Sequence, residues 1–340
     1  MENPNAPARD PSELTFQLAI GYMPASCIHA VTRLKIADLL KDGPRPVSEL
    51  ARLTSTSEDI LYRILRALSS TGLFAETTPR TFANTPSSDI LREDHPSNVR
   101  DLLLWMSDPF HFDTYRDMMP TLRDGKPALE HIHHKNAFEV IFSDPVVTKS
   151  FNDGMTALSA LVVPAVLEAY SFEGIGTLAD IAGGHGMVLT SIAQRYPNMK
   201  GILFDLKNVV EGAKDRIQKL GLANRVQSVA GDFFETVPAA DAYIMKSIIH
   251  DWDDERAIRI IKNCGAHLKK GGKVILVESV LPTGSEPTLG KWVDIEMFMM
   301  PGGRERTEPE YRDLFQRAGF VLTRVVPTKS PMSVIEAQKA

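Results

Sequence analysis

The chain has 340 residues, of which 43% are hydrophobic and 24% charged, values that exclude a disordered chain and allow two globular domains. Its net charge of −5 argues against a surface that neutralises nucleic-acid phosphates. The two cysteines, Cys27 and Cys264, are too few for a disulfide framework or a cysteine-based zinc site, as is typical of the reducing cytosol.

The first ten or so residues are polar and contain proline, which predicts a frayed tail rather than a signal peptide. No apolar stretch approaches the roughly 20 residues that span a bilayer. We therefore expect a cytoplasmic protein with no membrane association.

The N-terminal part has the pattern of a winged helix. Residues 14–43 carry apolar side chains at helical spacing and predict a helix that closes at Gly43. A short helix opening at Ser48 follows, and then a second helix with one aliphatic face that ends at Gly72. The strands LFAE and TFAN predict a hairpin after it. Helix, turn, helix and hairpin predict a winged-helix domain over residues 1–96.

The remainder divides into a helical segment and an α/β domain. Residues 97–160 have mostly helical character and are expected to connect the two domains and contribute to a binding pocket. After Gly174, amphipathic helical stretches alternate with strand-like runs, namely TLADIA, KGILFDL, RVQSVAGDF, DAYIMKSII and GKVILVESVL. This alternation predicts a Rossmann-like, doubly wound α/β domain over residues 161–340.

A glycine loop stands at the first strand-to-helix junction of that domain. In ADIAGGHGMVLTSIAQRYP, the backbone can turn tightly and approach a ligand at Gly183, Gly184 and Gly186. The dinucleotide fingerprint would need glycine where Leu189 stands, and no phosphate loop follows. A carboxylate at Asp180 would repel a pyrophosphate. The pattern favours a cofactor without phosphate but with a cationic amino acid part, such as S-adenosylmethionine.

Two more acids end the next two predicted strands. Asp205, followed by Leu206, stands where an acid that binds ribose belongs, and Asp232 with Phe233 would lie beside an adenine ring. Both acids could instead merely cap the following helices. We favour cofactor contact, because three acids end three successive strands.

With these residues in view, the sequence resembles the small-molecule O-methyltransferases, which include plant caffeate-type and animal hydroxyindole enzymes and many bacterial relatives. The resemblance is carried by DIAGGHG, FDLKNV, GDFFETVP, MKSIIHDWDDE, KKGGKVILVESVLP and PGGRERTEPEYRDLFQRAGF. The segment LYRILRALSSTGLF is similar to the family's dimerisation domain. The resemblance implies S-adenosylmethionine as cofactor, S-adenosylhomocysteine as product, no metal and a homodimer. Ala182 departs from the family, in which many members have glycine.

The resemblance implies that His250 is a general base bracketed by Glu278 and Glu305. A phenol has a pKa of about 10, so its deprotonation at neutral pH costs roughly 4 kcal/mol, which a positioned base reduces in the transition state. The carboxylates would fix the tautomer and stabilise the imidazolium. Alternatively, His250 could be a helix N-cap or a solvated histidine, because acidic residues follow it, and Glu305 could be an ordinary surface acid.

The family also implies further contacts. Lys246 would lie against the cofactor, and Asp251 near the substituents of the acceptor ring. Phe151 and Met155 match a pair that clamps this ring. Four further residues could complete the wall of the pocket around the acceptor ring, namely Trp105, Phe110, Met297 and Met300. For these four, packing in the hydrophobic core is an equal alternative.

Two other signals are discounted. The run HIHH, residues 131–134, is a polar stretch expected between helices, and it alone does not supply a metal site. A winged helix can bind DNA, but the second helix would turn Glu58 and Asp59 toward phosphate. We therefore expect dimerisation through this domain and no nucleic-acid partner.

The sequence predicts an S-adenosylmethionine-dependent O-methyltransferase that methylates a hydroxyl of a small aromatic metabolite, of phenol, catechol, flavonoid or polyketide type, by in-line transfer. Methyl transfer to nitrogen or carbon is the first alternative, and a histidine base disfavours it because such acceptors need the base less. An NAD-dependent dehydrogenase and a winged-helix DNA-binding regulator are the remaining alternatives.

Overall fold

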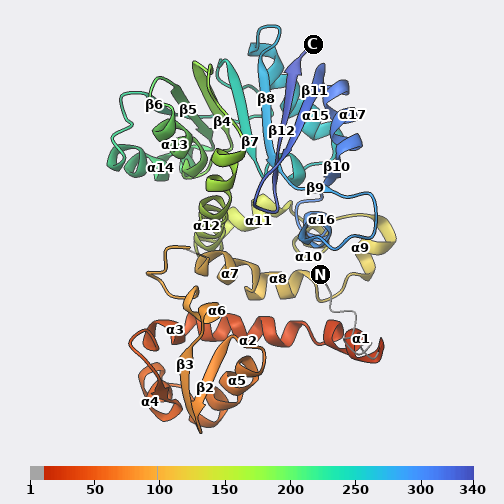
Figure 1. Ribbon diagram of the computed structural model, residues 1–340. Helices are drawn as coiled ribbons and strands as arrows, with labels where there is room; N and C mark the ends of the chain where they lie inside the picture. Colours follow the sequence, from red (N-terminus) through yellow and green to blue (C-terminus); the bar gives the residue numbers. More distant parts are fainter. Residues whose placement is uncertain (1–10, 98) are drawn as a thin grey trace, which may run out of the picture. The chain divides into compact units, whose positions relative to one another are not determined.

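The computed structural model describes residues 11–97 and 99–340. The chain, drawn in Figure 1, divides into two compact units between Asp113 and Thr114. The N-terminal unit has one hydrophobic core, and the C-terminal unit has two, one on each face of its sheet. The predicted tail falls almost wholly on residues 1–10, which lie outside the described part. The domain limits expected at residues 96 and 160 stay a prediction.

The N-terminal unit is mainly helical and contains a small sheet of strand order β1-β3-β2. The hairpin β2–β3 is antiparallel and follows the helix pair α4–α5, so the predicted order of helix, turn, helix and hairpin is confirmed. Its elements are α1 (Pro11–Ala19), α2 (Tyr22–Arg33), α3 (Ile36–Leu39), β1 (Arg45–Pro46), α4 (Val47–Thr54), α5 (Glu58–Ser70), β2 (Phe74–Thr78), β3 (Thr81–Asn84), α6 (Pro86–Asp89), α7 (Arg100–Met106) and α8 (Pro109–Thr114), the last of which crosses the division.

The single helix predicted for residues 14–43 is wrong, because the structure breaks it into α1, α2 and α3. Lys35 has a φ of 56°, a left-handed conformation that interrupts the helix. Gly43, with a φ of 130°, lies in the turn before β1 and caps no helix. Apolar side chains from α2 and α3 enter one common core, and so their spacing continues across the break.

The C-terminal unit is built on a seven-stranded sheet of order β11-β12-β8-β7-β4-β5-β6. The strands β4 to β8 that belong to it pair in parallel, and β12 is antiparallel to both β8 and β11, which confirms the predicted Rossmann-like sheet. The strands are β4 (Thr177–Ile181), β5 (Lys200–Asp205), β6 (Val226–Ala230), β7 (Ala242–Lys246), β8 (Lys273–Glu278), β11 (Phe320–Pro327) and β12 (Ser333–Lys339).

Helices cover both faces of this sheet (Figure 1). On β7, Ala242 and Ile244 enter one core, whereas Tyr243 and Met245 enter the other, as the two-residue period of a strand requires. One face is covered by α12 (Pro145–Ala169), α13 (Met187–Arg195) and α14 (Lys207–Lys219), and the other by α15 (Asp254–His267) and α17 (Glu308–Arg317). In open α/β sheets, ligands bind beyond the carboxyl ends of the parallel strands.

The segment before this sheet is helical, as predicted. It contains α9 (Met119–Asp124), α10 (Ala128–His133) and α11 (Ala137–Ser143). The HIHH run lies largely within α10, so its expected position between helices is wrong. The later elements are α16 (Leu289–Met299) and the parallel pair β9 (Val280–Leu281) and β10 (Arg306–Thr307).

One helix of the described residues, α12, is long and apolar enough to cross a membrane by length and composition alone, with a mean hydropathy of 1.3, and α1 with α2 passes only as a bent pair. The expectation that no stretch approaches this length is therefore wrong. A core helix passes the same test, and α12 buries Val162, Val163 and Val166 against the sheet.

Candidate active site

His250 lies just beyond the carboxyl end of β7, in the short 3-10 helix Ile249–Asp251. The chain reaches it through Ser247, whose φ of 55° is strained for a residue with a Cβ. The imidazole is buried, and the residue is 8% exposed. Asp253, not His250, is the N-cap of α15. The alternatives of a helix cap and of a solvated histidine are therefore wrong.

Glu278, the last residue of β8, is completely buried and holds the turn that carries His250. Its Oε1 accepts the backbone N–H groups of Ile248 and Ile249, both at 2.9 Å. Its Oε2 lies 3.6 Å from His250 Nδ1 and has no hydrogen-bond partner within the described chain.

Glu305 comes to the same place because β10 pairs with β9, with Arg306 opposite Val280. Glu305 is 3% exposed, so the alternative of a surface acid is wrong. Its Oε1 lies 2.7 Å from His250 Nδ1, and its backbone N–H donates to Asp294 of α16. Sequence reasoning missed Asp294, which is one of two acids, with Glu296, in a largely apolar helix.

The electrostatics of the cluster follow from burial and from its carboxylates. Burial alone lowers the pKa of His250, but the charges of Glu278, Glu305 and Asp251 together raise it to about 10. Burial raises the pKa of Glu278, and it raises that of Asp251 to about 7. Because both glutamates face Nδ1, the neutral ring keeps its proton there and leaves the lone pair on Nε2. Asp251 Oδ1 lies 3.5 Å from that Nε2.

Lys246 links this cluster electrostatically to the glycine loop. Burial lowers the pKa of its ammonium group, and the charges of Glu278, Asp180 and Asp251 act against this. The carboxylates of both regions therefore act on one half-buried cation at the end of β7.

The glycine loop packs directly over Asp180. A Cβ on Gly183 would lie 2.5 Å from Leu203 Cδ1 and 2.7 Å from the Asp180 carboxyl group, so only glycine fits. Asp180 is 1% exposed, its Oδ2 has no hydrogen-bond partner in the described part, and burial raises its pKa to about 7. Gly184 and Gly186 have φ values of 57° and 74°, which favour glycine.

Asp205 ties the loop to β5 instead of capping α14. Its Oδ2 accepts the N–H of Gly184 at 2.8 Å and its Oδ1 that of Leu206 at 2.7 Å, while the N-cap of α14 is Leu206. Asp232 Oδ1 accepts the N–H of Phe234 at 2.7 Å and closes a turn. Cofactor contact by both acids stays a prediction.

Ala182 adopts a φ of 53° in the same loop, in the left-handed region where a Cβ is unfavourable. Ala182→Gly should therefore raise the free energy of unfolding by about 0.5–1 kcal/mol. Urea denaturation checks this, with Ala179→Gly in β4 as the control that loses stability. An equal loss in both variants would contradict strain at Ala182.

An aromatic cluster extends from α12 to Trp252, which stands two residues after His250. Phe151 of α12 packs against Phe138 and Phe142 at centroid distances of 6.5 and 6.1 Å. Phe138 lies 5.6 Å from Trp252, and Trp252 lies 6.0 Å from Phe233. The structure thus connects Phe151 and Phe233, which were predicted for acceptor and cofactor. Sequence reasoning missed Phe138, Phe142 and Trp252, although Trp252 stands two residues after His250.

The remaining wall candidates fall in two places. Met155 lies one turn after Phe151 on α12, and Met297 and Met300 lie at the end of α16, where the Met297 carbonyl accepts N–H groups from the following loop. Trp105 and Phe110 contact each other in the N-terminal unit, with centroids 5.8 Å apart. Their role in binding an acceptor stays a prediction.

Metal-ligating side chains also meet at the cluster. Within residues 11–97 and 99–340, the group whose possible ligand atoms all lie within 4.8 Å consists of His250, Glu278 and Glu305. HIHH forms no such group there. One of its members, His131, instead pairs with Asp124 at 3.1 Å.

Comparison with known proteins identifies both units. Residues 115–321 match the model of the O-methyltransferase domain, and residues 16–94 match that of the O-methyltransferase dimerisation domain. Over 338 residues, 99% of each chain, the protein is 37% identical to a phenazine O-methyltransferase of Lysobacter antibioticus. It is 33% identical to caffeic acid 3-O-methyltransferase 1 of Ocimum basilicum over 89% of each chain.

A solved structure shows the same fold. CalO1, a methyltransferase in calicheamicin biosynthesis determined with S-adenosylhomocysteine bound, superimposes with a TM-score of 0.85 at 32% identity, covering 99% of this chain and 100% of its own. These matches extend over both units. The chain therefore belongs to the family of S-adenosylmethionine-dependent small-molecule O-methyltransferases.

Proposed function

We propose that the protein methylates a hydroxyl group of a small aromatic metabolite, with His250 as the general base. The observation that supports this best is a buried imidazole whose Nδ1 faces two buried glutamates, which leaves Nε2 of the neutral ring as the proton acceptor. A phenol, catechol, flavonoid or polyketide hydroxyl would suit such a base, because each is a weak acid at neutral pH.

The residues at the carboxyl edge of the sheet fit S-adenosylmethionine. Asp180 has a buried oxygen without a partner in the described chain, and a Cβ on Gly184 would meet open space, so the loop can receive a cationic amino acid part. When bound, S-adenosylmethionine supplies an electrophilic methyl group on its sulfonium. The residues proposed to hold it are Asp180, Gly183, Gly184, Gly186, Asp205, Leu206, Asp232, Phe233 and Lys246.

The chain's own residues would move one proton. His250 Nε2 takes the proton of the acceptor hydroxyl, while Nδ1–H donates to Glu305 and keeps the ring oriented. The charges of Glu278 and Glu305 stabilise the imidazolium that forms. Phe151 and Met155 would hold the acceptor ring, because a flat apolar wall fixes its orientation, and Asp251 beside Nε2 would contact its substituents. Trp105, Phe110, Met297 and Met300 are proposed to complete the wall.

An acceptor panel with isotope-labelled S-adenosylmethionine tests this function. Phenols, catechols, flavonoids, hydroxyindoles and polyketide phenols are compared with matched aryl amines, each with and without EDTA. We expect label on hydroxyl groups only and no effect of EDTA. Label on amines alone would favour the nitrogen alternative, and loss of activity in EDTA would require a metal at the cluster. Binding of NAD but not S-adenosylhomocysteine in calorimetry would favour a dehydrogenase.

The setting of this activity is proposed as a cytoplasmic homodimer without membrane or nucleic-acid partners, with domains over residues 1–96, 97–160 and 161–340. The dimerisation-domain match supports the homodimer. At the start of α5, Arg80 is paired with Glu58 at 2.6 Å and Arg63 with Asp59 at 3.1 Å. Cations already paired with acids contact phosphate poorly, so DNA binding is disfavoured.

A further inference from the structure

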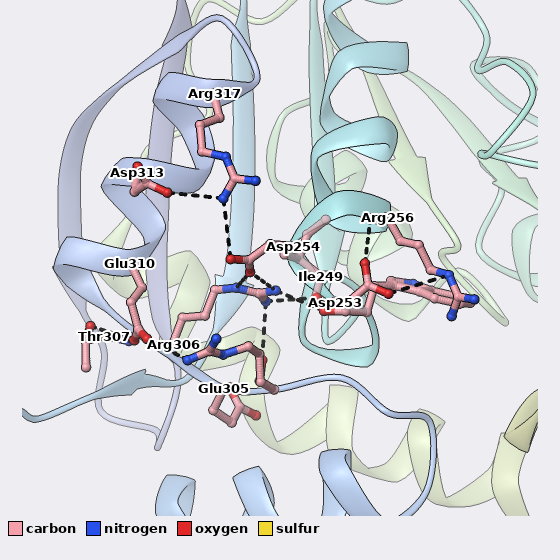
Figure 2. Close-up of polar contacts among 12 residues, drawn as sticks. Ile249, Asp253, Asp254, Arg256, Glu305, Arg306, Thr307, Glu310, Asp313 and Arg317 are labelled. Carbon is pink, nitrogen blue, oxygen red and sulfur yellow. Dashed lines mark hydrogen bonds and ion pairs between the residues drawn. The ribbon is translucent and has the colours of Figure 1, made fainter. Parts of the chain in front are cut away.

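Arg306 is a fully charged side chain in the interior of the C-terminal unit. It is only 1% exposed, and it directly follows Glu305 in the chain. Arginine is almost never buried to this extent unless its donors are paired. Figure 2 shows its guanidinium group beside Ile249 and Asp254.

The guanidinium group binds the backbone on both sides of His250. Nη1 donates to the carbonyl of Ile249 at 3.1 Å, and Nη2 donates to the carbonyl of Trp252 at 2.9 Å. Ile249 directly precedes His250, and Trp252 follows it by two residues. Two donors of one rigid, planar group therefore span the short helix that carries the imidazole.

Asp254 fixes the direction of this guanidinium group. Its Oδ1 accepts from Nε at 3.0 Å and from Nη2 at 2.8 Å. Its Oδ2 lies 3.6 Å from Arg317, which also pairs with Asp313 at 3.3 Å (Figure 2). Asp254 therefore balances the charge of the buried Arg306 guanidinium group, and Arg317 in turn holds Asp254.

The remaining groups of the turn are held by other residues. Glu278 accepts the N–H groups of Ile248 and Ile249, and the N–H of Arg304 donates to the His250 carbonyl at 2.8 Å. The Glu278 carboxylate therefore holds the N–H groups at the start of the turn, and the Arg306 guanidinium group holds the carbonyl groups on both sides of His250. A turn entered through strained Ser247 needs such support, because strain persists only where the surroundings hold it.

We propose that Arg306 is a positioning residue for the reaction: it clamps the carbonyls on both sides of His250 and so keeps the imidazole directed between Glu278 and Glu305. The role rests on the proposed function of His250 as the base. Arg306 does not contact the acceptor in this role and acts only through the histidine.

Two substitutions separate the geometry of Arg306 from its charge. Lysine keeps the positive charge but lacks the planar fork that reaches two carbonyls, and methionine removes both. We expect kcat to fall about tenfold in Arg306→Lys and about 10²-fold in Arg306→Met, as for a catalytic group displaced by about 1 Å. The KM for both substrates and the affinity for S-adenosylhomocysteine should stay within about twofold of wild type.

Arg225 supplies a matched control. This half-buried arginine also binds carbonyls, donating to Ala193 at 2.5 Å and to Met199 at 3.2 Å, and it makes no contact with the His250 turn. Arg225→Met should lower the melting temperature but leave kcat per folded molecule unchanged. If Arg225→Met lost as much kcat as Arg306→Met, Arg306 would be a structural residue only and the proposal would fail.

Imidazole nitrogen NMR gives a readout independent of turnover. Among the nine histidines, His250 is assigned from the signals lost in His250→Gln. The spectra are recorded at a pH at which the ring is neutral. There the wild-type ring should carry the proton on Nδ1, and in Arg306→Lys it should become a mixture of both tautomers. An unchanged tautomer with unchanged kcat in Arg306→Lys would overturn the proposal.

The outcomes also separate this proposal from the proposed function. If His250→Gln kept normal turnover, the base would be wrong, while a tautomer change in Arg306→Lys would still support positioning. If Arg306→Met failed to fold, two single variants, Asp254→Asn and Arg306→Lys, would replace it. Asp254→Asn weakens the anchor of the guanidinium group but leaves its donors, so a smaller loss of kcat than in Arg306→Lys is expected. A wild-type kcat in both would refute the clamp.

Discussion

His250→Gln should lower turnover by about 10²- to 10⁴-fold while the affinity for S-adenosylhomocysteine stays unchanged. Glutamine can still donate a hydrogen bond to Glu305, but it cannot accept a proton at neutral pH. Steady-state kinetics with an acceptor found in the panel measures the loss, and calorimetry measures the affinity. Near-normal turnover would remove His250 from the mechanism.

The pH dependence of this variant provides a second check. The surrounding carboxylates raise the pKa of His250 to about 10, so its neutral, proton-accepting form grows as the pH rises from neutrality. The kcat/KM of wild type should therefore increase towards alkaline pH, and His250→Gln should lack this increase. An increase that comes from ionisation of a phenolic acceptor, with its own pKa of about 10, would occur with both enzymes, so it is subtracted by measuring both with the same acceptor. His131→Gln is the control, because His131 pairs with Asp124 in the same unit and should keep the wild-type profile.

Gly303→Ala should destabilise the protein and abolish most of its activity, because two segments of the backbone are in close contact at this position. A Cβ there would lie 2.0 Å from the His250 carbonyl oxygen, 2.3 Å from the Asp251 carbonyl carbon and 2.6 Å from the Trp252 nitrogen. All three are backbone atoms, so either the loop that carries Gly303 or the turn that carries His250 must move. We expect a loss of about 2–4 kcal/mol in the free energy of unfolding and about a 10²-fold loss of kcat.

Urea denaturation and kcat measured on the folded fraction check this prediction. Gly212→Ala in α14 is the matched control, because the nearest atom to its Cβ belongs to the movable side chain of His185, at 3.3 Å. This control should keep nearly wild-type stability. If Gly303→Ala had the same midpoint and kcat as wild type, the two loops could not be in close contact.

The sequence was sufficient to predict the parallel part of the sheet, because alternating strands and amphipathic helices mark each βαβ unit. It was not sufficient for β11 and β12. No helix separates these two strands, so the alternation does not reach them. The break between α2 and α3 was also missed, because both helices bury side chains in one core and so keep a continuous apolar spacing. The apolar side chains Leu14, Phe16 and Leu18 of α1 are instead exposed, and the spacing alone does not distinguish them from core residues.

Within the site, the sequence was sufficient to predict His250, because a histidine directly before a run of acids is unusual. It was also sufficient for Glu278 and Glu305, because both stand in motifs that resemble the family. The supporting residues could not be predicted. The need for glycine at Gly303 comes from the backbone of His250, far away in the chain, and no local pattern reveals it. Arg306 lies in the motif PGGRERTEPEYRDLFQRAGF, yet its proposed role depends on which carbonyl groups accept its hydrogen bonds. Ser247 adopts a left-handed conformation without the glycine that usually signals one.

The strand order has a consequence for how the enzyme can diversify. The glycine loop and the acids at the ends of β4 and β5 belong to one half of the sheet, whereas His250, Glu278 and Glu305 depend on β7, β8 and β10. Under the proposed roles, Lys246 of β7 is the one cofactor residue that lies in the second half. Substitutions elsewhere in that half would change the acceptor side of the site while the residues proposed to hold the methyl donor on β4 and β5 stay the same.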